Sequence, residues 1–453
     1  MRRSTLGAVA LIFALPGLVL AADWPYWRGP NHDGVSAEMG WRTDWAARPP
    51  KVLWTANVGL RHATVVVAAG RVYTYGDDAE DKAHNQIVYC LDAATGKELW
   101  KYSMAVVAYS NQHTIFAPTL DGDALYAYSG SGLLACLDAA TGRVRWEKDL
   151  VKELGAYRSP SYGYRSCPVV MGDPVIVTTR VDAQPAKGNE KVNLAAFHKA
   201  TGQLAWLSAQ ATVDMKPGGG SWAQGGPWGS HWGTPVPATV NGKPVLVYHT
   251  GYGVAGIDPA TGKNRWEYVI PDGELGDEPG VTAISPVVVD NKILFVYMPG
   301  HQVKNGKIYC VEVAPDNTTR QLWKSPDINN WKYGNITAYK GLLFGNNEWG
   351  RYQWDPLVCL DLATGKKLWE QKAVGGGFTI ADGKLIVWDG ERIRVAAASP
   401  DGYKELAVSP PMPTAKSPGK DDIGSGGQIT PILTNGRVYC RNHLGELFCL
   451  DIR

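Results

Sequence analysis

The sequence predicts an all-β protein built from copies of one short hairpin unit. The clearest copy is YCLDAATGKELW at residues 89–100, and other segments follow the same pattern. Those segments are LACLDAATGRVRW (134–146), LAAFHKATGQLAW (194–206), VAGIDPATGKNRW (254–266), LVCLDLATGKKLW (357–369) and, without the Thr-Gly pair, IYCVEVAPDNTTRQLW (308–323). Composition agrees with a turn-rich repeat protein, because 52 residues are Gly, 18 are Trp and only 19% are charged. Repetition of this kind weighs more than any single segment in choosing a fold.

Each copy has the chemistry of two strands joined by a tight turn. An apolar run comes first, Asp-x-x-Thr-Gly follows, and a second strand ends in Trp. In the first copy, Gly96 suits a turn position with positive φ, and the Asp92 side chain can bond to the backbone of its own turn. Two apolar runs separated by turn residues predict a β-hairpin.

The repeated pattern x-L-D-x-x-T-G-x-x-x-W resembles the blade repeat of the quinoprotein-type, or PQQ-like, β-propellers. The resemblance covers residues 51–453 and implies an eight-bladed β-propeller with Trp-docking repeats. It implies less about function, because the same repeat serves PQQ-dependent dehydrogenases, the outer-membrane assembly scaffold BamB and other secreted proteins.

The number of repeats predicts that the first and last strands of the propeller belong to the same blade. Blade seven has Leu406 where Trp is expected, and blade eight, at residues 428–452, lacks its outer strand. The segment KVLWTANVG at residues 51–59 has the form of that strand. We therefore expect the N-terminal strand to close the last blade, because closure removes open sheet edges. The Trp residues expected to pack between neighbouring blades are Trp54, Trp100, Trp146, Trp206, Trp266, Trp323 and Trp369.

Most of the cysteines occupy one equivalent position, just before Leu-Asp or Val-Glu. They are Cys90, Cys136, Cys310, Cys359 and Cys449. That equivalence indicates a small buried slot in each blade rather than a bridge between blades. A hairpin centred on Leu444 and Gly445 would set Cys440 opposite Cys449, so a disulfide between them stays open as an alternative in an oxidising compartment. The chain has no CxxC or CxxCH motif, which excludes covalent haem attachment.

The first 21 residues have the pattern of a secretory signal peptide. Arg2 and Arg3 precede an apolar run at residues 6–20, too short for a membrane span, and a small-residue site ends at Ala21. We expect cleavage near Ala21 and a periplasmic or secreted protein. No Cys stands at the cleavage point and no later run is long enough to span a bilayer, so neither a lipid anchor nor a membrane span is expected. A net charge of +2 indicates no nucleic-acid partner.

After the signal peptide, the chain divides into an N-terminal arm at residues 22–50 and the propeller at residues 51–453. The arm, DWPYWRGPNHDGVS and onward, resembles the opening segment of many secreted PQQ-like propellers. We expect Trp24 and Trp27 to pack on the propeller wall, and a binding role for them is the alternative.

All long connections are expected on one face. With strands A to D running outward from the axis, every A–B and C–D turn is short, as in VNGK at 240–243, and the long segments are all B–C or D–A connections. Loops on a rigid scaffold carry function, so this loop face is the predicted functional face. Its segments interleave aromatic residues with Gly, as in KPGGGSWAQGGPWGSHWG at 216–233. That composition suits a flat ring ligand, a sugar or a peptide, and anchoring of the loops to the rim is the alternative.

Residues at the start of the A strands should line an axial funnel on the loop face. Alignment on the repeated small-residue–Pro pattern places His113, Arg165, Trp232, Thr282 and Gln428 there, and Asn335 and Phe378 take this role in blades six and seven. The candidate ligand funnel, with nearby loop residues, is His113, Arg165, His231, Trp232, Asn335, Gln428, Trp349 and Arg351. A water-filled channel whose polar groups are all satisfied is the alternative.

Three functions fit these features. The chain has no serine-triad, HExxH, EF-hand or nucleotide-loop motif, so we first expect a binding or assembly scaffold, monomeric and without a resident cofactor. Its partner would be an envelope or extracellular protein, or a small ligand at the axial funnel.

The resemblance implies an alternative, a PQQ- and Ca²⁺-dependent alcohol or sugar dehydrogenase. Trp232 or Trp349 would then lie under the quinone and Arg165 would bind its carboxylates. The metal ligands would be Glu278, Asn346 and Glu348. A carbohydrate-binding propeller is a further alternative, and no residue stands out as catalytic.

Overall fold

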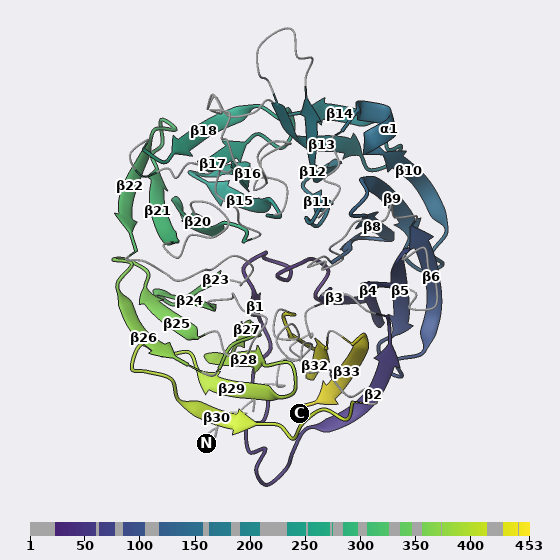
Figure 1. The fold of residues 1–453 in the computed structure, drawn as a ribbon, viewed down its shortest axis with the longest axis vertical. Helices are drawn as coiled ribbons and strands as arrows, with labels where there is room; N and C mark the ends of the chain where they lie inside the picture. Colours follow the sequence, from purple (N-terminus) through teal and green to yellow (C-terminus); the bar gives the residue numbers. More distant parts are fainter. Residues whose placement is uncertain are drawn as a thin grey trace, which may run out of the picture.

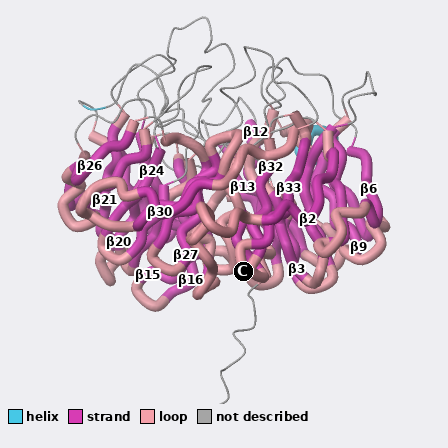
Figure 2. The backbone as a smooth tube through the Cα atoms, turned by 90° about the horizontal axis from the view of Figure 1, so that it is seen from below, coloured by secondary structure: helices cyan, strands magenta, loops and turns pink. Residues whose placement is uncertain are grey.

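The computed structural model shows a ring of eight β-sheets set like blades around a central axis, which confirms the eight-bladed propeller (Figure 1). The structure describes residues 23–59, 63–77, 85–104, 117–156, 163–182, 191–208, 233–250, 252–271, 274, 284–297, 306–325, 336–346, 356–372, 374–414, 429–442 and 444–453. Seen from the side, the strands run between the two faces of the ring (Figure 2). Each blade has four antiparallel strands, and one blade gains a fifth, parallel strand.

The first four blades follow one another along the chain. Blade one contains β3 (Val65–Ala68), β4 (Arg71–Asp77), β5 (Gln86–Asp92) and β6 (Glu98–Met104). Blade two contains β7 (Thr119–Asp121), β8 (Ala124–Tyr128), β9 (Leu133–Asp138) and β10 (Val144–Asp149), followed by the short helix α1 (Leu150–Leu154). Blade three contains β11 (Val169–Val170), β12 (Pro174–Asp182), β13 (Lys191–His198) and β14 (Leu204–Leu207). Blade four contains β15 (Val236–Val240), β16 (Lys243–His249), β17 (Gly253–Ile257) and β18 (Asn264–Val269).

The other four blades complete the ring. Blade five contains β19 (Val287–Val289), β20 (Lys292–Tyr297), β21 (Lys307–Val313) and β22 (Thr319–Lys324). Blade six contains β23 (Ile336–Tyr339), β24 (Leu342–Asn346), β25 (Leu357–Asp361) and β26 (Lys367–Gln371). Blade seven contains β27 (Gly377–Ala381), β28 (Lys384–Trp388), β29 (Ile393–Ala397) and β30 (Glu405–Val408), with β1 (Val35–Ser36) added beside β27. Blade eight contains β31 (Ile432–Thr434), β32 (Arg437–Arg441), β33 (Glu446–Asp451) and β2 (Lys51–Asn57).

The inner hairpins turn through left-handed backbone positions. Between β15 and β16, Asn241 and Gly242 have φ values of 50° and 72°. Between β27 and β28, Asp382 and Gly383 have φ values of 50° and 71°. Two successive positive φ values are typical of the type I′ turn, which matches the twist of the paired strands. These compact A–B turns lie at the opposite face from the B–C and D–A connections.

The repeated Asp-x-x-Thr-Gly turn is held by its own side chains. In blade one, the Asp92 carboxylate accepts hydrogen bonds from the Thr95 amide at 2.8 Å and from the Thr95 hydroxyl at 2.7 Å. Gly96 completes the turn with a φ of 72° and donates its amide to the Asp92 carbonyl at 2.8 Å. The same side-chain bonds recur in blades two and six.

The Trp that ends an outer strand docks on the turn of the next blade. Trp100 of blade one donates its indole N–H to the Ala139 carbonyl of blade two at 3.2 Å. Its ring lies against Gly142, where an added Cβ would come within 2.7 Å of the ring. The turn therefore needs Gly both for its φ and for the approach of the Trp. Indole N–H bonds of this kind are made by Trp54, Trp100, Trp146, Trp206, Trp323 and Trp369.

Trp266 packs in a different way. Its ring lies over Gly256 on the neighbouring strand of its own blade, where an added Cβ would come within 2.1 Å of the ring. The next blade is the one whose turn lost the Thr-Gly pair, so it offers no turn glycine to dock on. The residue is still buried, as the sequence predicts.

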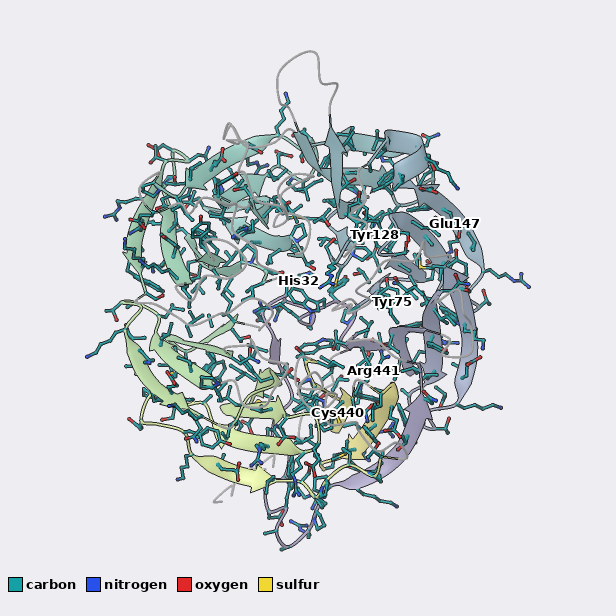
Figure 3. All side chains as sticks on the ribbon, in the orientation of Figure 1. His32, Tyr75, Tyr128, Glu147, Cys440 and Arg441 are labelled. Carbon is teal, nitrogen blue, oxygen red and sulfur yellow. The ribbon has the colours of Figure 1, made fainter. Side chains whose placement is uncertain are left out.

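The N-terminal strand closes blade eight, as the repeat count predicts. Strand β2 pairs antiparallel with β33, and Trp54 lies opposite Cys449. Trp54 then donates to the Ala93 carbonyl of blade one at 3.1 Å. Arg441 of blade eight adds a second tie, because it donates to the Gly59 carbonyl at 2.6 Å and lies fully buried (Figure 3).

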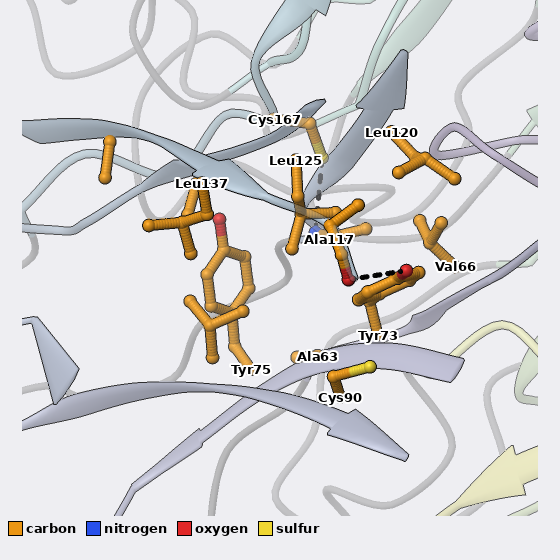
Figure 4. Close-up of a cluster of buried hydrophobic side chains, with 14 of the residues drawn as sticks. Ala63, Val66, Tyr73, Tyr75, Cys90, Ala117, Leu120, Leu125, Leu137 and Cys167 are labelled. Atoms are coloured by element: carbon orange, nitrogen blue, oxygen red, sulfur yellow. Dashed lines mark hydrogen bonds between the residues drawn. The ribbon is translucent and has the colours of Figure 1, made fainter. Parts of the chain in front are cut away.

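Apolar side chains fill the spaces between blades. The cluster between blades one and two includes Tyr73, Tyr75 and Leu125 (Figure 4). The Tyr73 hydroxyl donates to the Ala139 carbonyl at 3.1 Å, and the Tyr75 hydroxyl accepts the Tyr128 amide at 2.9 Å. The buried polar ends of these rings are thus satisfied while the rings fill the core.

All seven cysteines are free and buried. The equivalent ones lie directly opposite the docking Trp of their blade, as Cys90 does with Trp100. The hairpin register that would set Cys440 opposite Cys449 is wrong, because Cys440 lies opposite Phe448 and Cys449 lies opposite Tyr439. The hairpin is shifted by one residue, which sends the two sulfur atoms to opposite faces of the sheet.

The predicted signal peptide, residues 1–21, lies outside the described residues. Along the stretches that the structure describes, there is no helix with the length and hydrophobicity needed to cross a membrane.

Candidate functional site

The N-terminal arm enters the central channel between blades one and two. Trp24 pairs with Val67 of β3 through two main-chain hydrogen bonds of 2.6 and 3.0 Å, and its side chain is fully buried. The next carbonyl, of Pro25, accepts the Leu120 amide of β7 at 3.0 Å. Trp24 therefore packs on the propeller wall, as expected from the sequence.

The arm then crosses the axis to blades six, seven and eight (Figure 1). Arg28 donates through Nη2 to the Ile336 carbonyl of blade six at 2.7 Å. Strand β1 pairs with β27 of blade seven, with Val35 opposite Ile380. Ser36 donates its hydroxyl to the Leu433 carbonyl of blade eight at 2.8 Å.

The arm leaves the axis across the tight-turn face. The Glu38 carboxylate accepts the amides of Asn435 and Gly436 at 2.8 and 3.1 Å, in the A–B turn of blade eight. Trp41 and Trp45 are then buried in the core between blades seven and eight. The arm thus reaches the tight-turn end of the channel at Glu38, while its Arg28 contacts Ile336 at the start of an inner strand.

A small cavity remains beside the arm on the axis. It is about 10 Å³, room for about one water molecule. The arm and four blades line it, with Trp27, Arg28, Gly34, Thr64, Thr337, Phe378, Thr430 and Ile432. The blade residues come from the beginning of inner strands, which is the position the sequence predicts for an axial funnel. Phe378 is the funnel residue that both the alignment and the structure place there.

The cavity carries one cation. Arg28 is only 5% exposed, and burial lowers the pKa of its guanidinium to about 10, so it stays charged at neutral pH. Burial and the neighbouring Arg28 lower the pKa of His32 to about 4, which keeps the imidazole neutral. His32 lies near the centre of the propeller (Figure 3). Its imidazole stacks on the Tyr26 ring, with the two ring centroids 4.9 Å apart.

Two other candidate site residues are described. Arg165 precedes β11 of blade three and is 6% exposed. Asn346 ends β24 of blade six and donates its side-chain amide to the Gly376 carbonyl at 2.7 Å. The Asn346 side-chain oxygen is buried and accepts no hydrogen bond from the residues that the structure describes. The candidates His113, His231, Trp232, Glu278, Thr282, Asn335, Glu348, Trp349, Arg351 and Gln428 lie outside the described residues.

Of the residues expected to hold a quinone with Ca²⁺, Arg165 and Asn346 lie among the described residues. Calcium takes six to eight oxygen ligands, and here Asn346 offers one oxygen from blade six while Arg165 belongs to blade three. Within the described ranges, no group of three His, Cys, Asp or Glu side chains could hold a metal ion.

Sequence reasoning missed the contribution of the arm to the axis. Arg28 was not among the candidates, because the arm was expected to pack on the propeller wall and the binding alternative concerned Trp24 and Trp27. The blade residues Thr64, Thr337 and Thr430 were not among the candidates either. One signal was present, an arginine between Trp27 and Gly29 in a short segment rich in Trp, Gly and Pro. A charged residue in such a segment needs a partner once the aromatic residues around it are buried.

Known proteins agree with the propeller geometry. The family model described as "Outer membrane protein assembly factor BamB" matches residues 84–371, more than half of the chain. Among proteins of curated function, none matches this chain by sequence.

Similar solved structures share the fold at low identity. The quinohemoprotein alcohol dehydrogenase of Comamonas testosteroni aligns with a TM-score of 0.67 and 13% identity, over 95% of this chain and 80% of that one. BamB of Moraxella catarrhalis aligns with a TM-score of 0.56 and 14% identity, over 89% and 99%. A europium-containing methanol dehydrogenase aligns with a TM-score of 0.64 and 14% identity, over 95% and 98%. These structural similarities show a shared fold alone, whereas the family-model match over residues 84–371 shows membership of a family. Closed by β2 and built on the docking Trp, this chain belongs to the PQQ-like propeller family whose model carries the BamB description.

Proposed function

We propose that this propeller is an exported binding protein that takes a partner protein of the cell envelope or exterior on its loop face. The observation that carries the proposal is the difference between the two ends of the ring. At one end the A–B and C–D turns are compact, and the arm reaches that end of the channel at Glu38. The longer connections all join strands at the other end, where a rigid ring can present them to a partner.

The family and the arm support the same proposal. The family model is described as an assembly factor, which is a protein that acts by binding others. The arm contacts blades one, two, six, seven and eight around the axis, and the cavity found beside it has room for about one water molecule. A partner bound by surface contacts suits such a ring better than a large cofactor in the described part of the channel.

Site-specific photo-crosslinking in the producing cells tests the proposal. A photoreactive amino acid at Pro271 or Lys372 stands at an exposed position just after an outer strand, on the loop face. The same group at Asn241 or Asp290 stands in an exposed A–B turn on the opposite face and serves as the control. We expect a discrete crosslinked partner from the loop-face positions and none from the control positions.

The dehydrogenase alternative is tested on the same purified protein. PQQ and Ca²⁺ are added, and bound quinone and dye reduction with alcohols and sugars are measured. Stoichiometric quinone with turnover, together with equal or absent crosslinks from the two faces, would overturn the binding proposal. Crosslinks confined to the loop face, without turnover, support it.

A further inference from the structure

The axial cavity holds a buried positive charge whose donors are only partly used. Arg28 donates through Nη2 to the carbonyls of Asp33 and Ile336 at 2.9 and 2.7 Å. An arginine has five N–H donors, so three remain, on Nε and Nη1. Across the part of the chain that the structure describes, neither of these atoms makes a hydrogen bond, and Nε is buried. A buried donor without an acceptor is costly, which indicates that something is missing beside Arg28.

The protein supplies little negative charge to balance Arg28. Within the described ranges, the guanidinium forms no ion pair, and no carboxylate lines the cavity. Arg28 lies close enough to lower the pKa of Asp33. Burial of the Asp33 carboxyl has the larger effect, so its pKa is raised overall. Its carboxylate accepts the Val35 amide at 2.9 Å instead. Asp33 is therefore a weak counter-ion, and a buried charge without a close partner is unfavourable.

Other groups around the cavity are donors as well. The Thr337 hydroxyl and the Trp27 indole N–H make no hydrogen bond within the described residues, and both side chains line the cavity. The Arg28 guanidinium carbon also lies 5.6 Å from the centre of the Trp27 ring, which fixes the two side chains together. The Thr64 hydroxyl differs, because its hydrogen is donated to the Thr430 carbonyl at 3.0 Å.

We propose that this cavity binds one small monovalent anion, a chloride ion or a single carboxylate group, between Arg28 and Thr337. A cation and two further donors surround the space, and the cavity of about 10 Å³ admits a group the size of a water molecule. Sulfate or phosphate is too large for it. Charge-assisted hydrogen bonds to such an anion satisfy the remaining donors and balance the buried charge. The proposal does not depend on a partner protein at the loop face.

Gly34 shapes the same site from the arm. Its φ is 78°, and an added Cβ would lie 2.9 Å from the Thr337 hydroxyl oxygen and 3.7 Å from Arg28 Nη2. A side chain at this position would occupy the space between Arg28 and Thr337, where the anion is proposed to bind. The glycine therefore keeps the cavity open where a larger residue would fill it.

Halide titration of the purified mature protein tests the proposal. The melting temperature Tm is followed as bromide or chloride replaces gluconate at constant ionic strength, with sulfate as the control salt. We expect a saturable rise in Tm with halide and none with sulfate. Thr337→Val removes one neutral donor and should weaken the apparent Kd about two- to tenfold. Arg28→Gln should abolish the saturable response, and Arg28→Lys should retain part of it.

A matched control and a second measurement keep the test independent of folding. Arg145→Gln changes a surface arginine that pairs with Asp123 and Asp138, and it should leave the halide response unchanged. Bromide-soaked crystals should show one anomalous peak beside Arg28 and Thr337. If formate displaces that bromide, the site accepts a carboxylate, and if only halides compete, the ligand is a free ion. A cavity that holds only water, or equal responses in Thr337→Val and the unaltered protein, would overturn the proposal.

Discussion

At the scale of single residues, the propeller depends on pairing one aromatic ring with one glycine. The docking Trp of one blade fills the space that a side chain on the next turn would need, as Trp54 does at Gly96 and Trp100 at Gly142. The same Trp also binds a carbonyl of that turn. In blade seven, Leu406 stands in place of Trp. The repeated Gly and Trp are thus two halves of one contact.

This contact can be measured by comparing two glycines with the same backbone conformation. Gly96 has a φ of 72° and an added Cβ would lie 2.6 Å from the Trp54 ring, whereas Gly70 has a φ of 74° and open space around it. Gly70→Ala should cost about 1–2 kcal/mol from the left-handed conformation alone. Gly96→Ala should cost about 1–3 kcal/mol more, because the ring must move. Urea denaturation of both variants gives the difference, and equal losses would show that the ring contact contributes nothing.

At the scale of elements, one seam of the ring is held without chain continuity. The chain leads from the outer strand of each blade to the inner strand of the next, from β2 to β3 as well, so the seam lies inside blade eight, between β33 and β2. Strand β2 reaches blade eight through its pairing with β33, and Trp54 then ties it to blade one. The arm adds contacts along the axis, including Ser36 with Leu433. Opening of the ring should therefore begin at β2.

Removing the docking Trp at this seam should release β2. Trp54→Ala deletes a buried ring and should cost about 3–5 kcal/mol in the free energy of unfolding. Limited proteolysis under native conditions should then cut within residues 46–59, because the loosened strand has no turn that joins it to β33. Trp146→Ala is the matched control, since β10 remains joined to β9 by a short turn. Similar protection of residues 46–59 in both variants would contradict a weak seam.

Elements with a local pattern could be predicted, and the route of the arm could not. The strand β2 carries the same outer-strand pattern as its equivalents, so KVLWTANVG identified its place. The arm follows no repeat, and its contacts join residues that are 308 positions apart for Arg28 and Ile336. The hairpin register expected for Cys440 failed for another reason, because one residue of turn length decides which face a sulfur takes. Of the candidate funnel, Phe378 lines the cavity, while most of the other candidates lie outside the described residues.

At the scale of the whole molecule, folding shifts the pKa values of buried histidines and of paired surface carboxylates, which respond to pH in separate ranges. Burial lowers the pKa of His249 to about 4, and burial together with Arg28 does the same for His32. Arg145 lowers the pKa of Asp138 to about 2, and Arg453 does so for Asp451. Protonation of the histidines therefore lowers the stability at a higher pH than protonation of these carboxylates does.

The sign of the histidine effect follows from proton binding. An unfolded histidine takes up its proton near its ordinary pKa of about 6.5, whereas the folded one remains neutral until about 4. Stability should therefore fall as the pH drops from about 6.5 to about 4, by up to about 3 kcal/mol for each histidine. The carboxylates have lowered pKa values, so their contribution is lost only as the pH falls further, from about 4 to about 2.

His249→Gln separates the two ranges. The His249 ring lies 3.0 Å from the Val296 carbonyl through Nε2, and a glutamine amide can donate to the same carbonyl without taking up a proton. Tm measured from pH 8 to pH 3 should fall less steeply between pH 6.5 and 4 in this variant than in the unaltered protein. Below that range the two profiles should run in parallel, because the carboxylates are unchanged. Profiles parallel across the whole range would show that His249 takes up its proton without opening the ring.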